Sequence, residues 1–157
     1  MKSKDLLILA NLRKNARMSL TNMSKKTSVP ISTIYDRLKI FNKDFVKKHT
    51  TLVDFSKLGY HTRANIALKV KKDDRDSIKE YLLKHQNVNS LYKINSGYDY
   101  LIEGVFVHIK DLDEFLENLD SKFTIEEKQT YYIVNDIKKE EFMSNPELIR
   151  QGIVGGK

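Results

Sequence analysis

Residues 19–41, SLTNMSKKTSVPISTIYDRLKIF, predict two short helices that meet at residues 28–30. Ser19 is a suitable N-cap for the first helix, which should end near Thr27. Pro30 fits the start of the second helix, because its missing N–H is not needed there. Apolar residues then recur along one side of this second helix, at Ile31, Ile34, Leu38 and Phe41. Its other side carries more polar and charged groups than packing requires.

A third helix is predicted just before this pair. Residues 4–15 repeat leucine, isoleucine and alanine at helical spacing and so carry one apolar stripe. Three short helices with a tight turn between the last two form a helix-turn-helix, whose final helix lies in the major groove of DNA. Ser24 should then lie where the last two helices cross, and Ile34 should fill the core between them.

The polar groups of the final helix and the basic groups around it are the candidate DNA contacts. Hydroxyls can donate to or accept from base edges, and a carboxylate can accept from cytosine N4. The candidates for base contact are Ser32, Thr33, Tyr35 and Asp36. Lysine and arginine neutralise phosphates, which dominates affinity. The candidates for phosphate contact are Arg17, Lys25, Lys26, Arg37 and Lys39.

Each assignment has a structural alternative. Arg37 could support the fold by pairing with a carboxylate or with a carbonyl at a helix end. Asp36 could pair only with Lys39, three residues further along the helix. Tyr35 could be an ordinary half-buried surface aromatic. The three-helix module as a whole could bind protein instead of DNA.

The charge is divided unevenly along the chain. Twelve Lys or Arg against three Asp give residues 1–50 a charge of +9, which leaves −2 for the remainder of a chain whose total is +7. Such asymmetry indicates that one half meets a polyanion while the other does something else. The alternative is that the basic residues only solvate a small helical domain.

Length and composition exclude several classes of protein. A chain of 157 residues can bury one core or two small ones. No apolar run approaches the roughly 18 residues that span a bilayer, and the N-terminal stretch is a poor secretory signal. We therefore expect no membrane association. The absence of cysteine excludes a disulfide framework and fits a cytoplasmic protein.

The remaining residues predict an α+β domain after a basic linker strand over residues 45–60. Strands and helices are expected in the order β-α-β-β-α-β, at residues 62–71, 73–85, 88–95, 100–109, 111–122 and 125–134. This order is the ferredoxin-like arrangement, with both helices on one face of an antiparallel sheet. Asp73, Asp74 and Asp76 favour the start of a helix over metal ligation.

The other face of this sheet is predicted to be open. Apolar and aromatic groups should occupy both faces, namely Tyr92, Ile94, Tyr100, Ile102, Tyr132 and Val134. A second copy of the chain should therefore cover the open face. The predicted domains are residues 1–44, the linker 45–60, the ferredoxin-like domain 61–138 and a tail 139–157. Ser144 or Asn145 with Pro146 could start a last short helix in that tail.

Three motifs in this order carry a resemblance to a known family: ILANLRKNARMS (8–19), STIYDRL (32–38) and SGYDYLIEGVF (96–106). Together with KLGY (57–60), they make residues 4–138 resemble the Lrp/AsnC, or feast/famine, family of bacterial and archaeal transcription regulators. The resemblance implies homodimers, which often assemble into tetramers or octamers. It also implies a ferredoxin-like RAM domain that pairs sheet to sheet and commonly binds an amino acid between dimers.

The resemblance also assigns residues. Ser32, Thr33, Tyr35 and Lys39 fall on DNA-facing positions, and Arg37 matches the family's regular arginine. The implied effector-binding residues are Gly97, Tyr98, Asp99, Tyr100 and Thr130. Two departures stand out: Ser28 replaces the usual glycine of the turn, and only Tyr98 separates Gly97 from Asp99, where two residues are usual.

We therefore expect a sequence-specific, homo-oligomeric regulator that binds double-stranded DNA, with control by an amino acid left open. The alternatives are an architectural DNA-binding oligomer without effector response and a protein-interaction module. RNA binding by the sheet is disfavoured by the net charge of −2 carried by residues 51–157. An enzyme is not expected, because the four histidines are scattered and no catalytic or phosphate-binding motif occurs. No cofactor or metal is expected.

Overall fold

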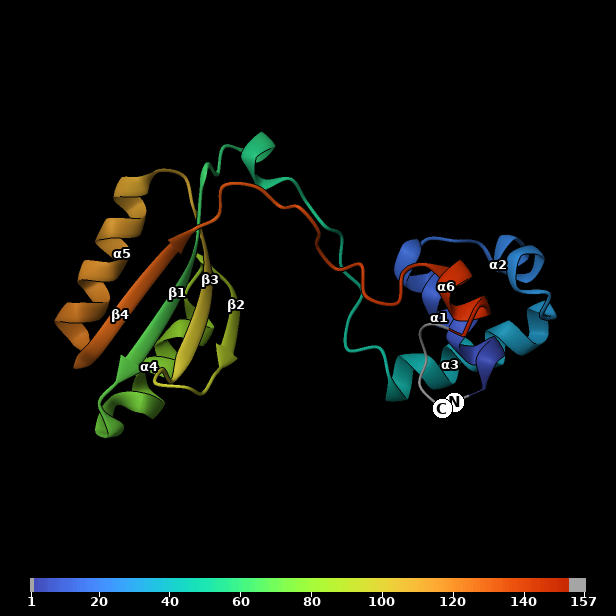
Figure 1. The fold of residues 1–157 in the computed structure, drawn as a ribbon, viewed down its shortest axis with the longest axis horizontal. Helices are drawn as coiled ribbons and strands as arrows, with labels where there is room; N and C mark the ends of the chain where they lie inside the picture. The colour runs from blue at the N-terminus through green and yellow to red at the C-terminus, as the bar shows by residue number, and fades with distance from the viewer. Residues whose placement is uncertain (1, 153–157) are drawn as a thin grey trace. The chain divides into compact units, whose positions relative to one another are not determined.

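The computed structural model describes residues 2–152, and these residues fall into two units (Figure 1). One unit contains the chain up to Thr51 together with the segment from Ile137 onwards. The other unit is Leu52–Asp136. The chain therefore passes between the units twice.

The helical unit contains four helices among the described residues. They are α1 (Ser3–Lys14), α2 (Leu20–Thr27), α3 (Ile31–Asp44) and the short α6 (Pro146–Arg150). The Ser19 hydroxyl accepts a hydrogen bond from the backbone N–H of Asn22 at 3.2 Å, which confirms Ser19 as the N-cap of α2. The core contains Ile8, Met23, Val29, Ile34 and Phe41. The predicted helix-turn-helix is thus present.

The start of α3 differs from the prediction in two details. Pro30 is the N-cap of α3 and not its first helical residue. Ile31, predicted to point inward, is 45% exposed, whereas Val29 in the turn is only 3% exposed. Val29 occupies the core position next to the turn, so the first residue of α3 is left outside.

The tail predicted at 139–157 belongs in part to the helical unit. Asn145 caps α6 by accepting from the N–H of Glu147, and Pro146 occupies the first turn, as the sequence predicted. Ile149 is buried at 4% exposure, and Figure 1 shows α6 beside α1. The predicted boundary at residue 138 is corrected to Asp136, because the segment after it packs on the helices. Residues 153–157 of that tail lie outside the described residues.

The predicted linker strand is absent. Residues 46–54, all of them described, form neither helix nor strand. A short 3-10 helix, η1 (Phe55–Leu58), comes next and ends at Gly59, whose φ of +90° favours glycine. A strand requires a neighbour to satisfy its backbone groups, and this stretch has no neighbouring strand in the described single chain.

The sheet unit has the predicted ferredoxin-like order. Its elements are β1 (Thr62–Val70), η2 (Lys72–Asp74), α4 (Arg75–Lys84), β2 (Val88–Lys93), β3 (Tyr100–Phe106), α5 (Ile109–Lys122) and β4 (Ile125–Tyr132). The strands lie in the order β2-β3-β1-β4, and every neighbouring pair is antiparallel. This is the topology that the alternation of strands and helices predicted.

The core of the sheet unit lies between one face of the sheet and the two helices. Alternate residues of β1 are buried, beginning with Ala64 and Ile66. They meet apolar residues of both helices, namely Ile78, Leu82, Leu112, Phe115 and Leu119. Gly104 belongs to this face, and a Cβ there would lie 2.5 Å from the Phe106 ring. In the described part of the chain, no helix is long and apolar enough to cross a membrane.

Candidate functional site

The outward side of α3 is exposed as the sequence predicted. Ile34 is fully buried and fixes the helix against the core, so the residues around it point outward. The exposed candidates on α3 are Ser32, Thr33, Tyr35, Asp36 and Lys39. The Lys39 ammonium lies 4.4 Å from the centre of the Tyr35 ring, whose residue is 51% exposed. This contact joins the two side chains one helical turn apart.

Arg37 and Asp36 differ from their neighbours on α3. Arg37 Nε lies 3.3 Å from Asp5 Oδ1, and Asp5 in α1 is only 8% exposed. This ion pair favours the alternative in which Arg37 supports the fold over a contact with a phosphate. No ion pair between Asp36 and Lys39 occurs among the described residues. Lys39 lies over Tyr35 instead.

Basic residues outside α3 are also exposed. Lys25 and Lys26 lie in the last turn of α2, where a positive charge also suits the negative end of the helix. Arg17 is exposed in the loop before α2, and its backbone N–H bonds to the Asn15 side chain at 2.9 Å. These three side chains share the helical unit with α3.

The turn between α2 and α3 has a left-handed residue without glycine. Ser28 has φ 54° and ψ 40°. Its N–H bonds to Ser24 O at 2.9 Å, and the Ser24 hydroxyl donates to Val29 O at 2.7 Å. Ser24 therefore contacts the turn through two hydrogen bonds, one to Ser28 and one to Val29.

Two residues of the predicted effector hairpin, Asp99 and Tyr100, are tied to β1 and α4. Asp99 Oδ2 accepts from the N–H of Val70 at 2.9 Å, and Asp99 Oδ1 lies 2.9 Å from Arg75 Nη2. Tyr100 is 7% exposed, and its hydroxyl donates to Arg75 O at 3.0 Å. Burial raises the pKa of Tyr100, with a smaller contribution from nearby carboxylates. Tyr100 is therefore a core residue.

The other predicted effector residues do not converge in the single chain. Gly97 has φ +97° at the tip of the hairpin. The Tyr98 hydroxyl donates to the Gln129 side chain at 3.2 Å. Thr130 pairs with Ile66 across the sheet, so it lies on the face covered by the helices, whereas Gln129 lies on the open face. The Tyr98 hydroxyl therefore contacts the open face of the sheet, whereas Thr130 lies on the opposite face.

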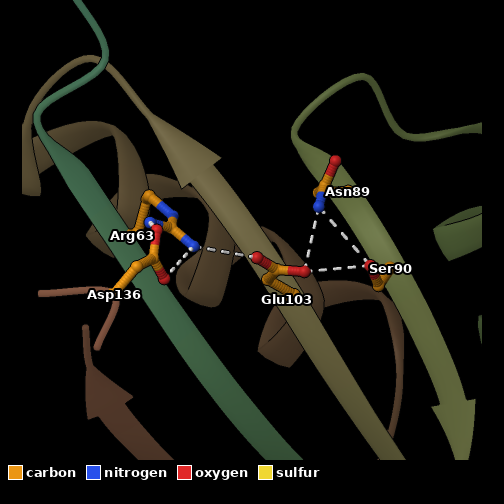
Figure 2. A network of polar contacts seen from close by, with 5 residues as sticks. All are labelled: Arg63, Asn89, Ser90, Glu103 and Asp136. Carbon is orange, nitrogen blue, oxygen red and sulfur yellow. Dashed lines mark hydrogen bonds and ion pairs between the residues drawn. The ribbon is translucent and has the colours of Figure 1, made fainter. Parts of the chain in front are cut away.

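Figure 2 shows a polar network on the open face of the sheet. The sequence analysis did not predict this network. Arg63 in β1 donates to Asp136 at 2.6 and 3.2 Å and to Glu103 in β3 at 3.1 Å. Glu103 also accepts from Asn89 and Ser90, each at 2.9 Å. The hydrogen bond to Asp136, together with the weaker effect of the one to Glu103, raises the pKa of Arg63. The alternation of β1 places Arg63 on this face, but only the fold supplies its partners.

The sheet unit also has an open groove of about 740 Å³. Phe55 and Leu58 of η1, His85 after α4, and Phe115 and Asn118 of α5 contribute to its lining. Burial lowers the pKa of His85, and the positive charge of Lys122 adds to this effect. Residues this far apart in sequence give no motif, so sequence analysis could not find the groove.

The acidic residues before α4 have a structural use. Asp74 is the N-cap residue of α4, and its Oδ2 accepts from the N–H of Thr124 at 2.8 Å. This backbone hydrogen bond lowers the pKa of Asp74. Within residues 2–152, no group of three His, Asp or Glu side chains could hold a metal ion.

Residues 63–142, which include most of the sheet unit, match the family model of the Lrp/AsnC ligand binding domain. The chain belongs to the Lrp/AsnC family. An uncharacterized HTH-type transcriptional regulator of Pyrococcus furiosus is 27% identical over 143 residues, which cover 90% of this chain and 96% of that protein. The family assignment confirms the resemblance seen in the sequence.

Solved structures of Lrp/AsnC proteins share the fold. The Neisseria meningitidis transcriptional regulator in complex with L-Met has a TM-score of 0.82 at 20% identity, covering 88% of this chain and 93% of that one. Escherichia coli AsnC has a TM-score of 0.81 at 21% identity, covering 91% and 98%. At these identities the likeness establishes the architecture of a helix-turn-helix joined to a RAM-type sheet domain.

Proposed function

We propose that this Lrp/AsnC protein is a sequence-specific transcriptional regulator that binds double-stranded DNA through α3. The observation that carries the proposal is the outward face of α3. Ser32, Thr33 and Tyr35 are exposed there, while Ile34 between them is fully buried. Side chains held in this way can reach base edges in the major groove.

The charge distribution supports the same proposal. The helical unit carries most of the positive charge of the chain, and Lys25, Lys26 and Lys39 expose theirs. Exposed cations neutralise phosphates and position a protein on the duplex. The relatives named as HTH-type transcriptional regulators support a role in transcription.

The regulator acts as a homo-oligomer in this proposal. The open face of the sheet carries Tyr92 and Tyr131, which are 54% and 51% exposed, and Leu101 lies opposite Tyr92. Exposed aromatic and apolar groups on a sheet face are suited to a second copy of the chain. Dimers, and tetramers or octamers built from them, are the assemblies to test.

Binding to DNA is tested by fluorescence anisotropy. The protein is titrated with duplex from its own upstream region and with a scrambled duplex, over a series of salt concentrations. Specific readout predicts a preference of about a thousandfold with a steep salt dependence. Equal affinity for both duplexes would contradict sequence-specific recognition, and no binding to either would favour the protein-interaction module.

Point variants separate base contacts from phosphate contacts. Thr33→Ala and Tyr35→Ala should reduce the preference for the specific duplex. Lys26→Ala should weaken both duplexes alike and lower the salt slope by up to about one unit. Equal losses on both duplexes for all three variants would contradict the role given to α3.

An architectural DNA binder without effector response is the second candidate, because Tyr100 is buried and Thr130 lies on the helix-covered face. A thermal-shift screen against the twenty amino acids separates it from an amino acid sensor. A ligand selective for the native state at 100 times its Kd stabilises by about 2.7 kcal/mol. A selective shift supports the sensor, and no shift across the panel supports the architectural role.

A further inference from the structure

The C-terminal segment holds the end of α2. Arg150, the last residue of α6, donates from Nη2 to the backbone oxygen of Lys26. Its Nη1 lies 3.0 Å from Glu147 Oε1, so the guanidinium is oriented by a residue of its own helix. Ile149 beside it is 4% exposed, which anchors α6 in the helical unit.

The Arg150 contact lies immediately before the turn between α2 and α3. The last carbonyls of a helix have no partner within that helix, and a cation there is favourable. Lys26 lies in the last turn of α2, two residues before the left-handed Ser28. A residue with a Cβ adopts that conformation less readily than glycine does. The turn therefore depends on the contacts that hold both of its sides.

Two contacts hold those sides. The Ser24 hydroxyl donates to Val29 O on the side of α3, and the Arg150 guanidinium bonds Lys26 O on the side of α2. The first helical residue of α3 is Ile31, so little chain separates this turn from the exposed Ser32 and Thr33. A change in the turn would change the direction of α3.

We propose that Arg150 is a positioning residue for DNA recognition: by holding Lys26 O, it fixes the turn from which α3 is presented. The inference rests on the proposed function, since it assumes that α3 contacts bases. The contact brings a residue from the far end of the chain to the helix-turn-helix, whose core residues all come from the first fifty positions.

Arg13 offers a matched control. It also joins the C-terminal segment to the helices through carbonyl oxygens, because its Nε donates to Phe142 O at 2.6 Å and its Nη2 to Glu140 O at 3.1 Å. Arg13 lies at the end of α1, where no turn into α3 begins. Arg13→Ala therefore removes a comparable contact without touching the turn.

The test uses the full chain with Arg150→Ala, Arg150→Lys and Arg13→Ala. Affinities for specific and scrambled duplex are measured by anisotropy, at a temperature where circular dichroism shows each variant folded. We expect Arg150→Ala to lower the preference for the specific duplex about tenfold, and Arg13→Ala to keep it. Arg150→Lys, which can still donate to the carbonyl, should restore part of the preference.

Hydrogen exchange gives a second readout that does not depend on DNA. The Ser28 N–H, bonded to Ser24 O, should exchange faster in Arg150→Ala and at the wild-type rate in Arg13→Ala. Unchanged preference and unchanged exchange in Arg150→Ala would overturn the inference while the proposed function stands. A wild-type protein without preference would overturn the proposed function and with it the DNA role of Arg150, whatever the exchange rates.

Discussion

Arg37 Nε lies 3.3 Å from Asp5 Oδ1, and this ion pair joins α3 to α1 within the helical unit. The side chain of Asp5 is 12% exposed and that of Arg37 is 36% exposed. A carboxylate buried to this extent needs a hydrogen-bonding cation. Arg37 therefore fixes α3 to α1, while its neighbours Tyr35 and Asp36 stay exposed.

Arg37→Ala should destabilise the helical unit by about 1–2 kcal/mol, because Asp5 is left without its cation. Urea unfolding monitored by circular dichroism measures the change. Asp36→Ala is the matched control: Asp36 is exposed on the same helix, so its loss should change the stability by less than about 0.5 kcal/mol. Similar losses for both variants would show that the ion pair is not stabilising.

Ser28→Gly should stabilise the helical unit by about 1 kcal/mol. The φ of 54° at this position suits glycine, whereas a Cβ carries a conformational cost there. Ser28→Ala removes only the hydroxyl and keeps the Cβ, so it should give no such gain. A stabilisation by both substitutions, measured in the same urea titration, would place the effect in the hydroxyl and not in the backbone.

The sheet unit should lose stability as the pH falls below the ordinary pKa of histidine, near 6.5. Burial of His85 lowers its pKa in the folded state, so the unfolded chain binds the proton more readily in this range. The contribution of neutral His85 to the free energy of unfolding is therefore fully present above that value, and it is lost as the pH falls towards the folded pKa. The neutral ring also accepts a hydrogen bond from the N–H of Asn87 at 3.3 Å, which protonation would remove.

Unfolding measured between pH 5 and 8 tests this dependence on His85. The variant His85→Gln cannot titrate and should show a flatter pH profile than the wild type. If the His85→Gln profile retained the wild-type slope, another group would be responsible.

Tyr100→Phe should destabilise the sheet unit by about 1 kcal/mol, because it removes a buried hydroxyl that donates to Arg75 O. Tyr98→Phe removes the hydroxyl that reaches Gln129 near the surface and should cost less than about 0.5 kcal/mol. Thermal unfolding compares the two. The reverse order would indicate that Tyr98, and not Tyr100, is the structural tyrosine of the hairpin.

Much of the fold could be predicted because each element carries a local periodic signal. The alternation along β1 and the helical spacing in α5 indicated their buried faces, since one side of each element must meet a core. The sequence could not tell whether Val29 or Ile31 would fill the core beside the turn. Both are apolar, and only the geometry of the turn decides between them.

The candidate site was predictable only where it lies within one helix. The exposed residues of α3 can be derived from its own period, and so can the buried Ile34. The role of Arg37 depends on Asp5 in another helix, and that of Arg63 depends on Asp136, 73 positions away. Pairs at such separations leave no periodic trace, so they become visible only after folding.

The contribution of α6 to the helical unit also sets an order of events during synthesis. Residues 2–51 leave the ribosome long before Ile149, with the whole of Leu52–Asp136 made in between. Domains tend to fold from the N-terminal side as they emerge. The nascent helix-turn-helix therefore lacks the contacts of α6 until the sheet has been translated. During that time the surface that later receives Ile149 is uncovered, and Lys26 O is open to water. The final form of the helical unit is thus reached only after Ile149 has been translated.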